Sequence, residues 1–362
     1  MRSLHKRTEL RLKLSNLPSL SPATIPILIN RLSRLIAEPD RMCAMFDGSF
    51  PSGLESKGSE ELIRNINRLR KDKKAIVLAH NYQRPEVQGI ADYVGDSVEL
   101  ARRAMEEKEA KILVVSAVDF MAENAFLLNP EKKVLIPSLD ARCPMARMLS
   151  IDDIKRYRRK YRGVPIILYV NTFAEAKARC DICCTSANAV EIVEKVGSDT
   201  VIFGPDYNLA EYVGEKTGKK IIPIPEDGFC PTHLAFDKEN ILLLKAKYAG
   251  ALVLAHPECT QEVRHAADFV GSTSQIIRYA KEAKAKTLII ATEEGVINRL
   301  KKESPEKEFI LAHRAGICPN MKKNTLERIY TSLKEEVYPV AIPKRIASKA
   351  RLALEIMFEL TS

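Results

Sequence analysis

Cys230-Pro231 ends the stretch Lys219-Lys-Ile-Ile-Pro-Ile-Pro-Glu-Asp-Gly-Phe-Cys-Pro231, and the same dipeptide ends two similar stretches at Cys143-Pro144 and Cys318-Pro319. The three cysteines lie 87 and 88 residues apart. Each follows, by 11 residues, a lysine that opens a short apolar run. One such match means little, but three matches at a single period predict a triplicated unit with one cysteine at the same place in each copy.

Three further runs recur with the same period. The first is continuously apolar and ends in a polar residue, which predicts a strand buried on both faces. It covers residues 75–80, 166–171 and 251–256. The second run ends at a hydroxyl residue that begins a helix, and the third is again apolar. They cover residues 91–97, 180–186 and 267–273, and then 111–115, 200–203 and 287–290. Strands that alternate with helices predict an α/β fold with parallel sheets covered by helices.

The length of 362 residues is enough for two or three hydrophobic cores. The repeat sets the predicted boundaries. They are an N-terminal extension (1–58), three units (59–150, 151–236 and 237–335) and a C-terminal helical segment (336–362). For the segment before the repeat, we favour an extension or a misassigned start over a targeting peptide.

Composition narrows the class of protein. The net charge of +10 suits anionic small molecules or nucleic acid and decides neither. There is no Trp and no tract of alternating basic and aromatic residues, so nucleic-acid binding is not expected. No apolar run reaches about 20 residues, so no membrane span is expected. No signal peptide is apparent, which predicts a cytoplasmic protein with reduced thiols.

The three periodic cysteines predict a metal centre. Each Cys-Pro lies a few residues beyond the carboxyl end of a predicted strand, where chemistry gathers in open α/β sheets. Three units packed about a threefold axis would bring three thiolates together. With no fourth periodic ligand, they favour an iron–sulfur cluster with one open iron, which can act as a Lewis acid. Catalytic zinc and a purely structural turn stay open as alternatives. Five cysteines do not recur, and we predict small core or loop residues for them: Cys43, Cys180, Cys183, Cys184 and Cys259.

Other polar groups recur beside the same axis. The first strands end at His80, Asn171 and His256, with Tyr82, Tyr169 and Glu258 nearby. Ser97, Ser186 and Thr273 stand at predicted helix N-termini. Such a hydroxyl is usually an N-cap, but three around one axis would aim three helix N-termini at a polyanionic ligand. His233 has no counterpart in the other units, which makes it a candidate acid/base group.

These residues lie in motifs that resemble one known family. The motifs are His80-Asn-Tyr-Gln83, Ile90-Ala-Asp-Tyr-Val-Gly-Asp-Ser97, Tyr169-Val-Asn171, Thr185-Ser-Ala-Asn188, Gly204-Pro-Asp206, Gly228-Phe-Cys-Pro-Thr-His233, His256-Pro-Glu-Cys259, Gly271-Ser-Thr273 and Cys318-Pro-Asn-Met321. From about residue 60 to 335, the chain resembles the quinolinate synthase family, the A protein of bacterial and archaeal NAD biosynthesis. The resemblance implies three pseudo-symmetric αβα three-layer sandwich units around one 4Fe-4S cluster.

The resemblance also implies an activity and roles for residues. The activity is condensation of iminoaspartate with dihydroxyacetone phosphate to quinolinate, phosphate and water, with the open iron as Lewis acid. An oxidase or dehydrogenase would supply the iminoaspartate. Cys143, Cys230 and Cys318 would hold the cluster, and Tyr82, His233 and Glu258 would be catalytic. The substrate would contact His80, Ser97, Tyr169, Asn171, Ser186, His256, Glu258 and Thr273.

Two points fall outside the resemblance. The N-terminal extension is not part of the family core. The Cys-x-x-Cys that some members carry before the third ligand is absent, because Ala315-Gly-Ile precedes Cys318. The alternative to an enzyme is a non-catalytic iron–sulfur or zinc regulatory protein. Such a protein would have no use for the histidines, tyrosines and hydroxyls at the strand and helix ends.

Overall fold

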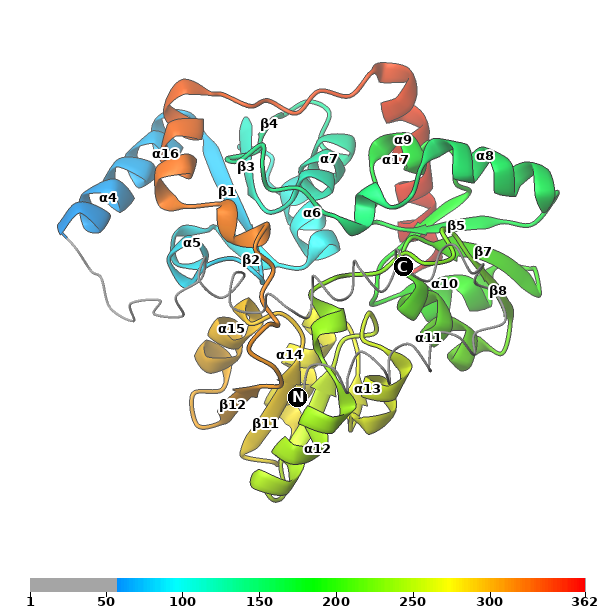
Figure 1. Cartoon of the computed structure of the whole chain (residues 1–362). Helices are drawn as coiled ribbons and strands as arrows, with labels where there is room; N and C mark the ends of the chain where they lie inside the picture. The colour runs from blue at the N-terminus through cyan, green and yellow to red at the C-terminus, as the bar shows by residue number, and fades with distance from the viewer. Residues whose placement is uncertain (1–56, 362) are drawn as a thin grey trace, which may run out of the picture. The chain divides into compact units, whose positions relative to one another are not determined.

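The computed structural model describes residues 57–361, so all but the last two residues of the predicted N-terminal extension lie outside it. The described residues form three four-stranded sheets in which every strand pair is parallel (Figure 1). Each sheet places its second strand at one edge, followed by its first, third and fourth. The predicted α/β fold with three like units is therefore confirmed.

The first sheet has the order β2-β1-β3-β4. Its strands are β1 (Ala75–His80), β2 (Tyr93–Gly95), β3 (Ile112–Ser116) and β4 (Lys133–Leu135). The helices of this segment are α4 (Lys57–Asp72), α5 (Pro85–Ile90), α6 (Ser97–Glu106) and α7 (Asp119–Leu128), followed by a 3₁₀ turn at Met145–Arg147.

The second sheet repeats this plan in the order β6-β5-β7-β8. Its strands are β5 (Ile166–Tyr169), β6 (Ile182–Cys184), β7 (Thr200–Gly204) and β8 (Lys220–Pro223). The helices are α8 (Ile151–Lys160), α9 (Ala174–Lys177), α10 (Ala189–Lys195) and α11 (Tyr207–Thr217), with a 3₁₀ turn at His233–Ala235.

The third sheet has the order β10-β9-β11-β12. Its strands are β9 (Leu252–Ala255), β10 (Phe269–Val270), β11 (Thr287–Ala291) and β12 (Glu308–Leu311). The helices are α12 (Lys238–Lys247), α13 (Gln261–Ala266), α14 (Thr273–Glu282) and α15 (Gly295–Glu303), with a 3₁₀ turn at Met321–Lys323.

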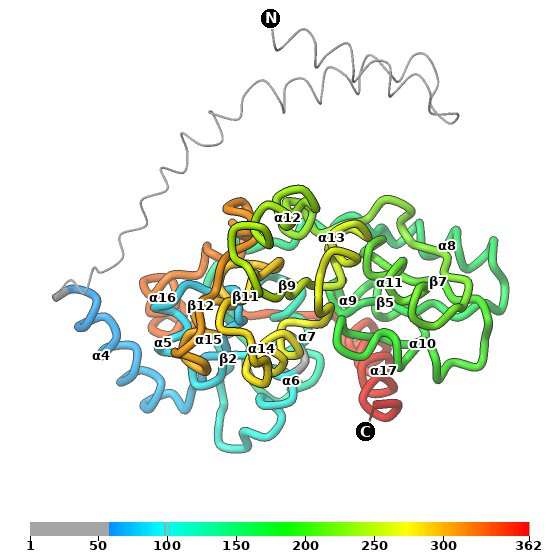
Figure 2. Tube along the Cα trace, turned by 90° about the horizontal axis from the view of Figure 1, so that it is seen from below, coloured from blue at the N-terminus to red at the C-terminus, as the bar shows by residue number. Residues whose placement is uncertain are grey.

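Two C-terminal helices pack back on earlier parts of the chain. The helix α16 (Leu326–Glu335) packs against α4 and β3, and α17 (Lys344–Leu360) packs against β6, α9 and α10. Figure 2 shows α17 beside α10. In the part of the chain that the structure describes, no helix combines the length and the apolar character needed to cross a membrane.

Each sheet is covered on both faces because successive strand residues point to opposite sides. In β1, Val77 and Ala79 pack with α4 and α16, whereas Leu78 packs with α6 and α7. The core that contains Leu78 also includes Leu254 and Leu288 of the third sheet. Helices on both faces make the three-layer arrangement that continuous apolar strands require.

The lysine that opens each repeated stretch has a structural explanation. Lys219 Nζ donates to the carbonyl oxygens of Val193 (2.8 Å) and Val196 (2.6 Å) at the C-terminus of α10. Lys307 does the same at the end of α14, and Lys132 at the end of α6. A cation there satisfies carbonyls that have no partner within the helix and opposes the negative end of the helix dipole.

Candidate functional site

A cavity of about 150 Å³ lies where the carboxyl ends of strands from all three sheets meet. This is where a parallel α/β sheet binds ligands, because loops diverge between its first and third strands. Every site residue predicted from the sequence lines the cavity. They are His80, Tyr82, Ser97, Cys143, Tyr169, Asn171, Ser186, Cys230, His233, His256, Glu258, Thr273 and Cys318.

The three cysteines occupy equivalent positions in the cavity wall. Each stands just before a 3₁₀ turn, and the backbone N–H three residues further on donates to its sulfur. Burial raises the pKa of all three thiols. A thiolate at these positions therefore needs a positive ligand, and a metal centre is the usual one.

One set of side chains in the cavity wall is close enough to share a metal ion. Within residues 57–361, one set of three candidate ligand atoms lies within 4.8 Å of one another: Cys230, His233 and Glu258. The three cysteines do not form such a set. The three cysteines line the same cavity and are its candidate metal ligands.

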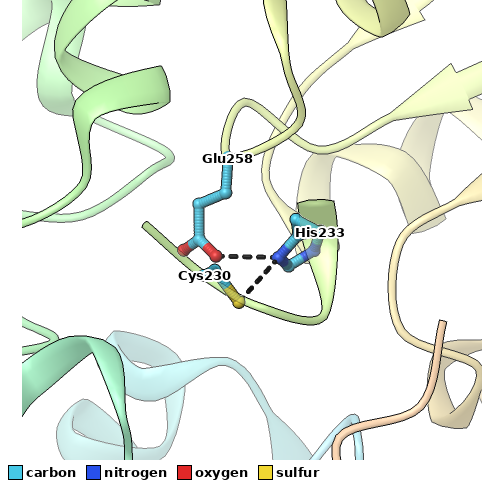
Figure 3. A group of neighbouring side chains, drawn as sticks. All are labelled: Cys230, His233 and Glu258. Carbon is cyan, nitrogen blue, oxygen red and sulfur yellow. Dashed lines mark hydrogen bonds and ion pairs between the residues drawn. The ribbon is translucent and has the colours of Figure 1, made fainter. Parts of the chain in front are cut away.

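The set Cys230, His233 and Glu258 is hydrogen-bonded (Figure 3). His233 Nδ1 lies 2.8 Å from Glu258 Oε2 and 3.2 Å from Cys230 Sγ. A tetrahedral zinc would hold the nitrogen and oxygen about 3.3 Å apart, so the 2.8 Å contact is that of a direct hydrogen bond. Burial alone raises the pKa of Glu258, but His233 and His256 beside it bring this pKa down to about 2. Glu258 is therefore ionised at neutral pH.

A chain of hydrogen bonds runs from His233 into the first unit. Thr292 Oγ1 lies 3.0 Å from His233 Nε2 and 2.8 Å from the Tyr82 hydroxyl oxygen. The hydroxyl oxygen of Tyr82 also lies 3.1 Å from Thr273 Oγ1. On the other side, Glu258 is hydrogen-bonded to Tyr169. Sequence reasoning missed Thr292, because it has no counterpart at the matching positions, Val118 and Pro205.

Two histidines hold one nitrogen against the backbone. His80 Nδ1 accepts the N–H of Tyr82 at 3.1 Å, and His256 Nδ1 accepts the N–H of Glu258 at 3.3 Å. Burial lowers the pKa of His80 to about 4 and that of His256 to about 3. Both rings are therefore neutral at pH 7, with their proton on Nε2. Each offers a single N–H donor to a ligand in the cavity.

Ser97 and Thr273 begin α6 and α14, as predicted, whereas Ser186 lies three residues before the start of α10. Asp96, not Ser97, accepts the N–H of Glu99 at the start of α6. Ser272, not Thr273, caps α14, through a capping box with Gln275. The N-cap of α10 is Asn188, two residues after Ser186. Asp96 and Ser272 bind the first-turn N–H groups of α6 and α14, so Ser97 and Thr273 are not needed as caps, whereas Asn188 makes no side-chain capping bond at α10.

Asn171 adds an orphaned polar atom. Its Oδ1 is buried in the cavity wall and has no hydrogen-bond partner within the protein. A buried acceptor without a partner costs about 1–3 kcal/mol, so such atoms in native proteins call for an explanation. A ligand that donates a hydrogen bond in the cavity would supply one.

The three α/β units thus share one buried pocket of cysteines, neutral histidines and a linked Tyr–Thr–His–Glu chain, which together define an enzyme site. The family model described as "Quinolinate synthetase A protein" matches residues 64–359. Curated proteins named quinolinate synthase are similar over 83% of this chain and 99% of their own length. They include those of Thermotoga maritima (50% identical), Pyrococcus horikoshii (49%) and Methanothermobacter thermautotrophicus (49%). The chain belongs to the quinolinate synthetase A family and is an enzyme of NAD biosynthesis. The alternative of a non-catalytic regulator is set aside.

Proposed function

We propose that the chain condenses iminoaspartate with dihydroxyacetone phosphate to give quinolinate, phosphate and water. The single observation that carries the proposal is the buried Tyr82–Thr292–His233–Glu258 chain beside three cysteines. Ring formation from these substrates requires carbon–carbon bond formation, phosphate loss and two dehydrations, one of which forms the carbon–nitrogen double bond of the ring. Each of these steps moves protons. The four hydrogen-bonded side chains offer proton donors and acceptors within hydrogen-bond reach of one another.

We propose a 4Fe-4S cluster held by Cys143, Cys230 and Cys318. Their equivalent positions in one cavity wall and the backbone N–H donor at each of them support this assignment. When bound, the cluster supplies a Lewis acid at its open iron. The protein residues around it then bind, orient and protonate the substrates.

Substrate binding falls to neutral donors that line the cavity. His80 and His256 each present one N–H to a carboxylate or phosphate oxygen. The hydroxyls of Ser97, Ser186 and Thr273 and the amide of Asn171 complete the set. Hydrogen bonds to a charged group contribute about 1.5–3 kcal/mol each, so several of them can hold an anionic substrate in a buried site.

Proton transfer falls to the linked chain. Burial raises the pKa of Tyr82 well above its usual value, so its hydroxyl keeps its proton and can donate it. Glu258 stays ionised and orients His233 through the 2.8 Å contact. His233 can then accept a proton from a substrate carbon and return it to a departing hydroxyl. Tyr169 is hydrogen-bonded to the Glu258 carboxylate and helps to fix its position.

The proposed substrates imply a place in metabolism. Iminoaspartate is hydrolytically labile, so an oxidase or dehydrogenase that produces it from aspartate must act alongside this enzyme. Both substrates are anionic small molecules, which agrees with the net charge of +10. We place the enzyme in the cytoplasm, where thiols remain reduced.

The test is turnover with an intact cluster. Protein purified without oxygen should contain iron and sulfide, and should form quinolinate from iminoaspartate and dihydroxyacetone phosphate. Cys143→Ala, Cys230→Ala and Cys318→Ala should each abolish the visible absorbance of the cluster, whereas Cys180→Ala should leave it. Full iron and sulfide content in Cys230→Ala would refute the ligand assignment. Intact cluster without quinolinate formation would refute the reaction.

A further inference from the structure

A carboxylate holds the backbone of each cavity cysteine. Asp119 Oδ1 accepts the N–H of Cys143 at 3.0 Å. Asp206 Oδ2 accepts the N–H of Cys230 at 3.1 Å, and Glu293 Oε1 accepts the N–H of Cys318 at 2.9 Å. The carboxylates precede their cysteines by 24, 24 and 25 residues, so they recur with the triplicated unit.

The topology explains why the same contact forms three times. Each carboxylate follows the third strand of its sheet, and each cysteine follows the fourth strand. The third and fourth strands are hydrogen-bonded neighbours in every sheet, so their carboxyl ends lie side by side. The carboxylate at the end of one strand therefore reaches the loop that leaves the next.

The carboxylates are themselves anchored. Asp206 and Glu293 are fully buried, and their second oxygens accept the N–H groups of Leu209 and Gly295 at 2.7 Å. Asp119 also accepts the N–H of Phe120, at 3.0 Å. An acceptor with two backbone donors has little freedom to move, so it fixes the cysteine backbone relative to the sheet.

We propose that Asp119, Asp206 and Glu293 are positioning residues that hold the three cysteine loops in register for the cluster. This inference rests on the proposed cluster. Three ligands from separate units must converge within a few tenths of an ångström, and ligands on loops are placed less accurately than ligands on strands. The carboxylates transfer the rigidity of the third strands to these loops.

The chain provides a matched control set at the opposite ends of the sheets. There, a carboxylate accepts the N–H of a first-strand residue 15 positions earlier. The pairs are Asp92 with Val77 (2.7 Å), Asp181 with Ile166 (2.7 Å) and Asp268 with Val253 (2.8 Å). These bonds have the same chemistry and the same threefold recurrence, but they lie at the amino ends of the strands. Their loss tests fold stability without touching the cysteine loops.

The experiment compares Asp119→Ala with Asp268→Ala in the full-length protein. Asp119 is chosen because it does not cap a helix, whereas Asp206 does. After anaerobic reconstitution, Asp119→Ala should hold less than half the iron and sulfide per folded chain. A chelator should remove its iron about tenfold faster or more, as loss of a bond to a charged group predicts. The electron paramagnetic resonance spectrum of the reduced cluster should change. Asp268→Ala should match wild type in all three measurements.

Asp119→Asn provides the second variant, because it conserves shape and keeps one acceptor. A neutral amide makes the weaker bond, so iron release should lie between wild type and Asp119→Ala. Iron release and spectra equal to wild type in both variants would overturn the inference. So would a normal cluster in a less stable Asp119→Ala protein, because the carboxylate would then serve the fold alone. Wild-type protein without iron and sulfide would instead overturn the proposed function.

Discussion

At the scale of single residues, neighbouring hydroxyls divide two tasks that one hydroxyl could have combined. Ser272 caps α14, and the adjacent Thr273 contacts Tyr82 in the cavity. A change at one residue of such a pair should therefore affect stability or catalysis, but not both.

We expect Thr273→Val, Ser97→Ala and Ser186→Ala to keep the cluster and to melt within a few degrees of wild type. Each should lose about tenfold to a hundredfold in kcat/KM, because a hydrogen bond to a charged substrate is worth about 1.5–3 kcal/mol. Ser272→Ala should do the reverse and lose about 1 kcal/mol of stability with near-normal turnover. Steady-state kinetics and urea unfolding separate the two. Normal kinetics in all three cavity variants would place the substrate elsewhere.

The neutral state of His80 predicts a pH dependence of stability. Burial lowers its pKa to about 4, below the unfolded value of 6.5. Between these values the unfolded chain binds a proton that the folded chain does not, so stability falls as the pH falls. For His80 alone, the loss between pH 7 and pH 5 is about 2 kcal/mol.

Urea unfolding of the cluster-free protein measures this loss. In His80→Gln the decline between pH 7 and pH 5 should be smaller by about the same 2 kcal/mol, because glutamine does not titrate. Other titrating groups contribute equally to both proteins. An identical decline in the two proteins would show that folding does not lower the pKa of His80.

At the scale of elements, the side chain of each repeated lysine caps the C-terminus of a helix that lies earlier in its own unit. Lys219→Met should cost about 1–2 kcal/mol of stability, because the carbonyls at the end of α10 lose their cation. Lys220→Met, at the exposed neighbouring position, is the matched control and should stay within about 0.5 kcal/mol of wild type. Urea unfolding measures both, and iron content should be normal in each. Equal stability of the two variants would contradict the capping role.

The strands could be predicted from the sequence because their apolar runs are continuous and recur. The run 75–80 became β1 without change, and the run 166–171 became β5 (Ile166–Tyr169). The helix starts were less certain. Asp96 and Ser97 are adjacent polar residues, and the sequence does not show which oxygen reaches the N–H of Glu99.

The contacts inside the cavity could not be predicted from the sequence, because they join residues far apart along the chain. Thr292 joins Tyr82 and His233, which are 210 and 59 residues away along the chain. The link between Asp206 and Cys230 is nearer, at 24 residues, and recurs in each unit. Its carboxylates could have been found by aligning the three units, but Glu293 is longer than its two counterparts. That difference hides the match.

At the scale of the whole molecule, the relatives suggest that the residues before the repeat are dispensable. The relatives match 99% of their own length to 83% of this chain, and the family match begins at residue 64. A truncated chain that begins at Lys57 should fold, bind its cluster and turn over within about twofold of full length. Iron analysis and quinolinate formation measure this. A truncated chain that folds but is inactive would give these residues a role.

The shared strand order of the three sheets has an evolutionary consequence. A ring of three identical subunits would repeat every substitution three times, so its central cavity would be forced to carry the same side chain on each wall. Joining the copies in one polypeptide removes that restriction. The equivalent ends of the first strands carry His80, Tyr169 and His256, and only one wall carries His233. The three sheets keep one strand order, while the side chains differ from one wall of the cavity to the next.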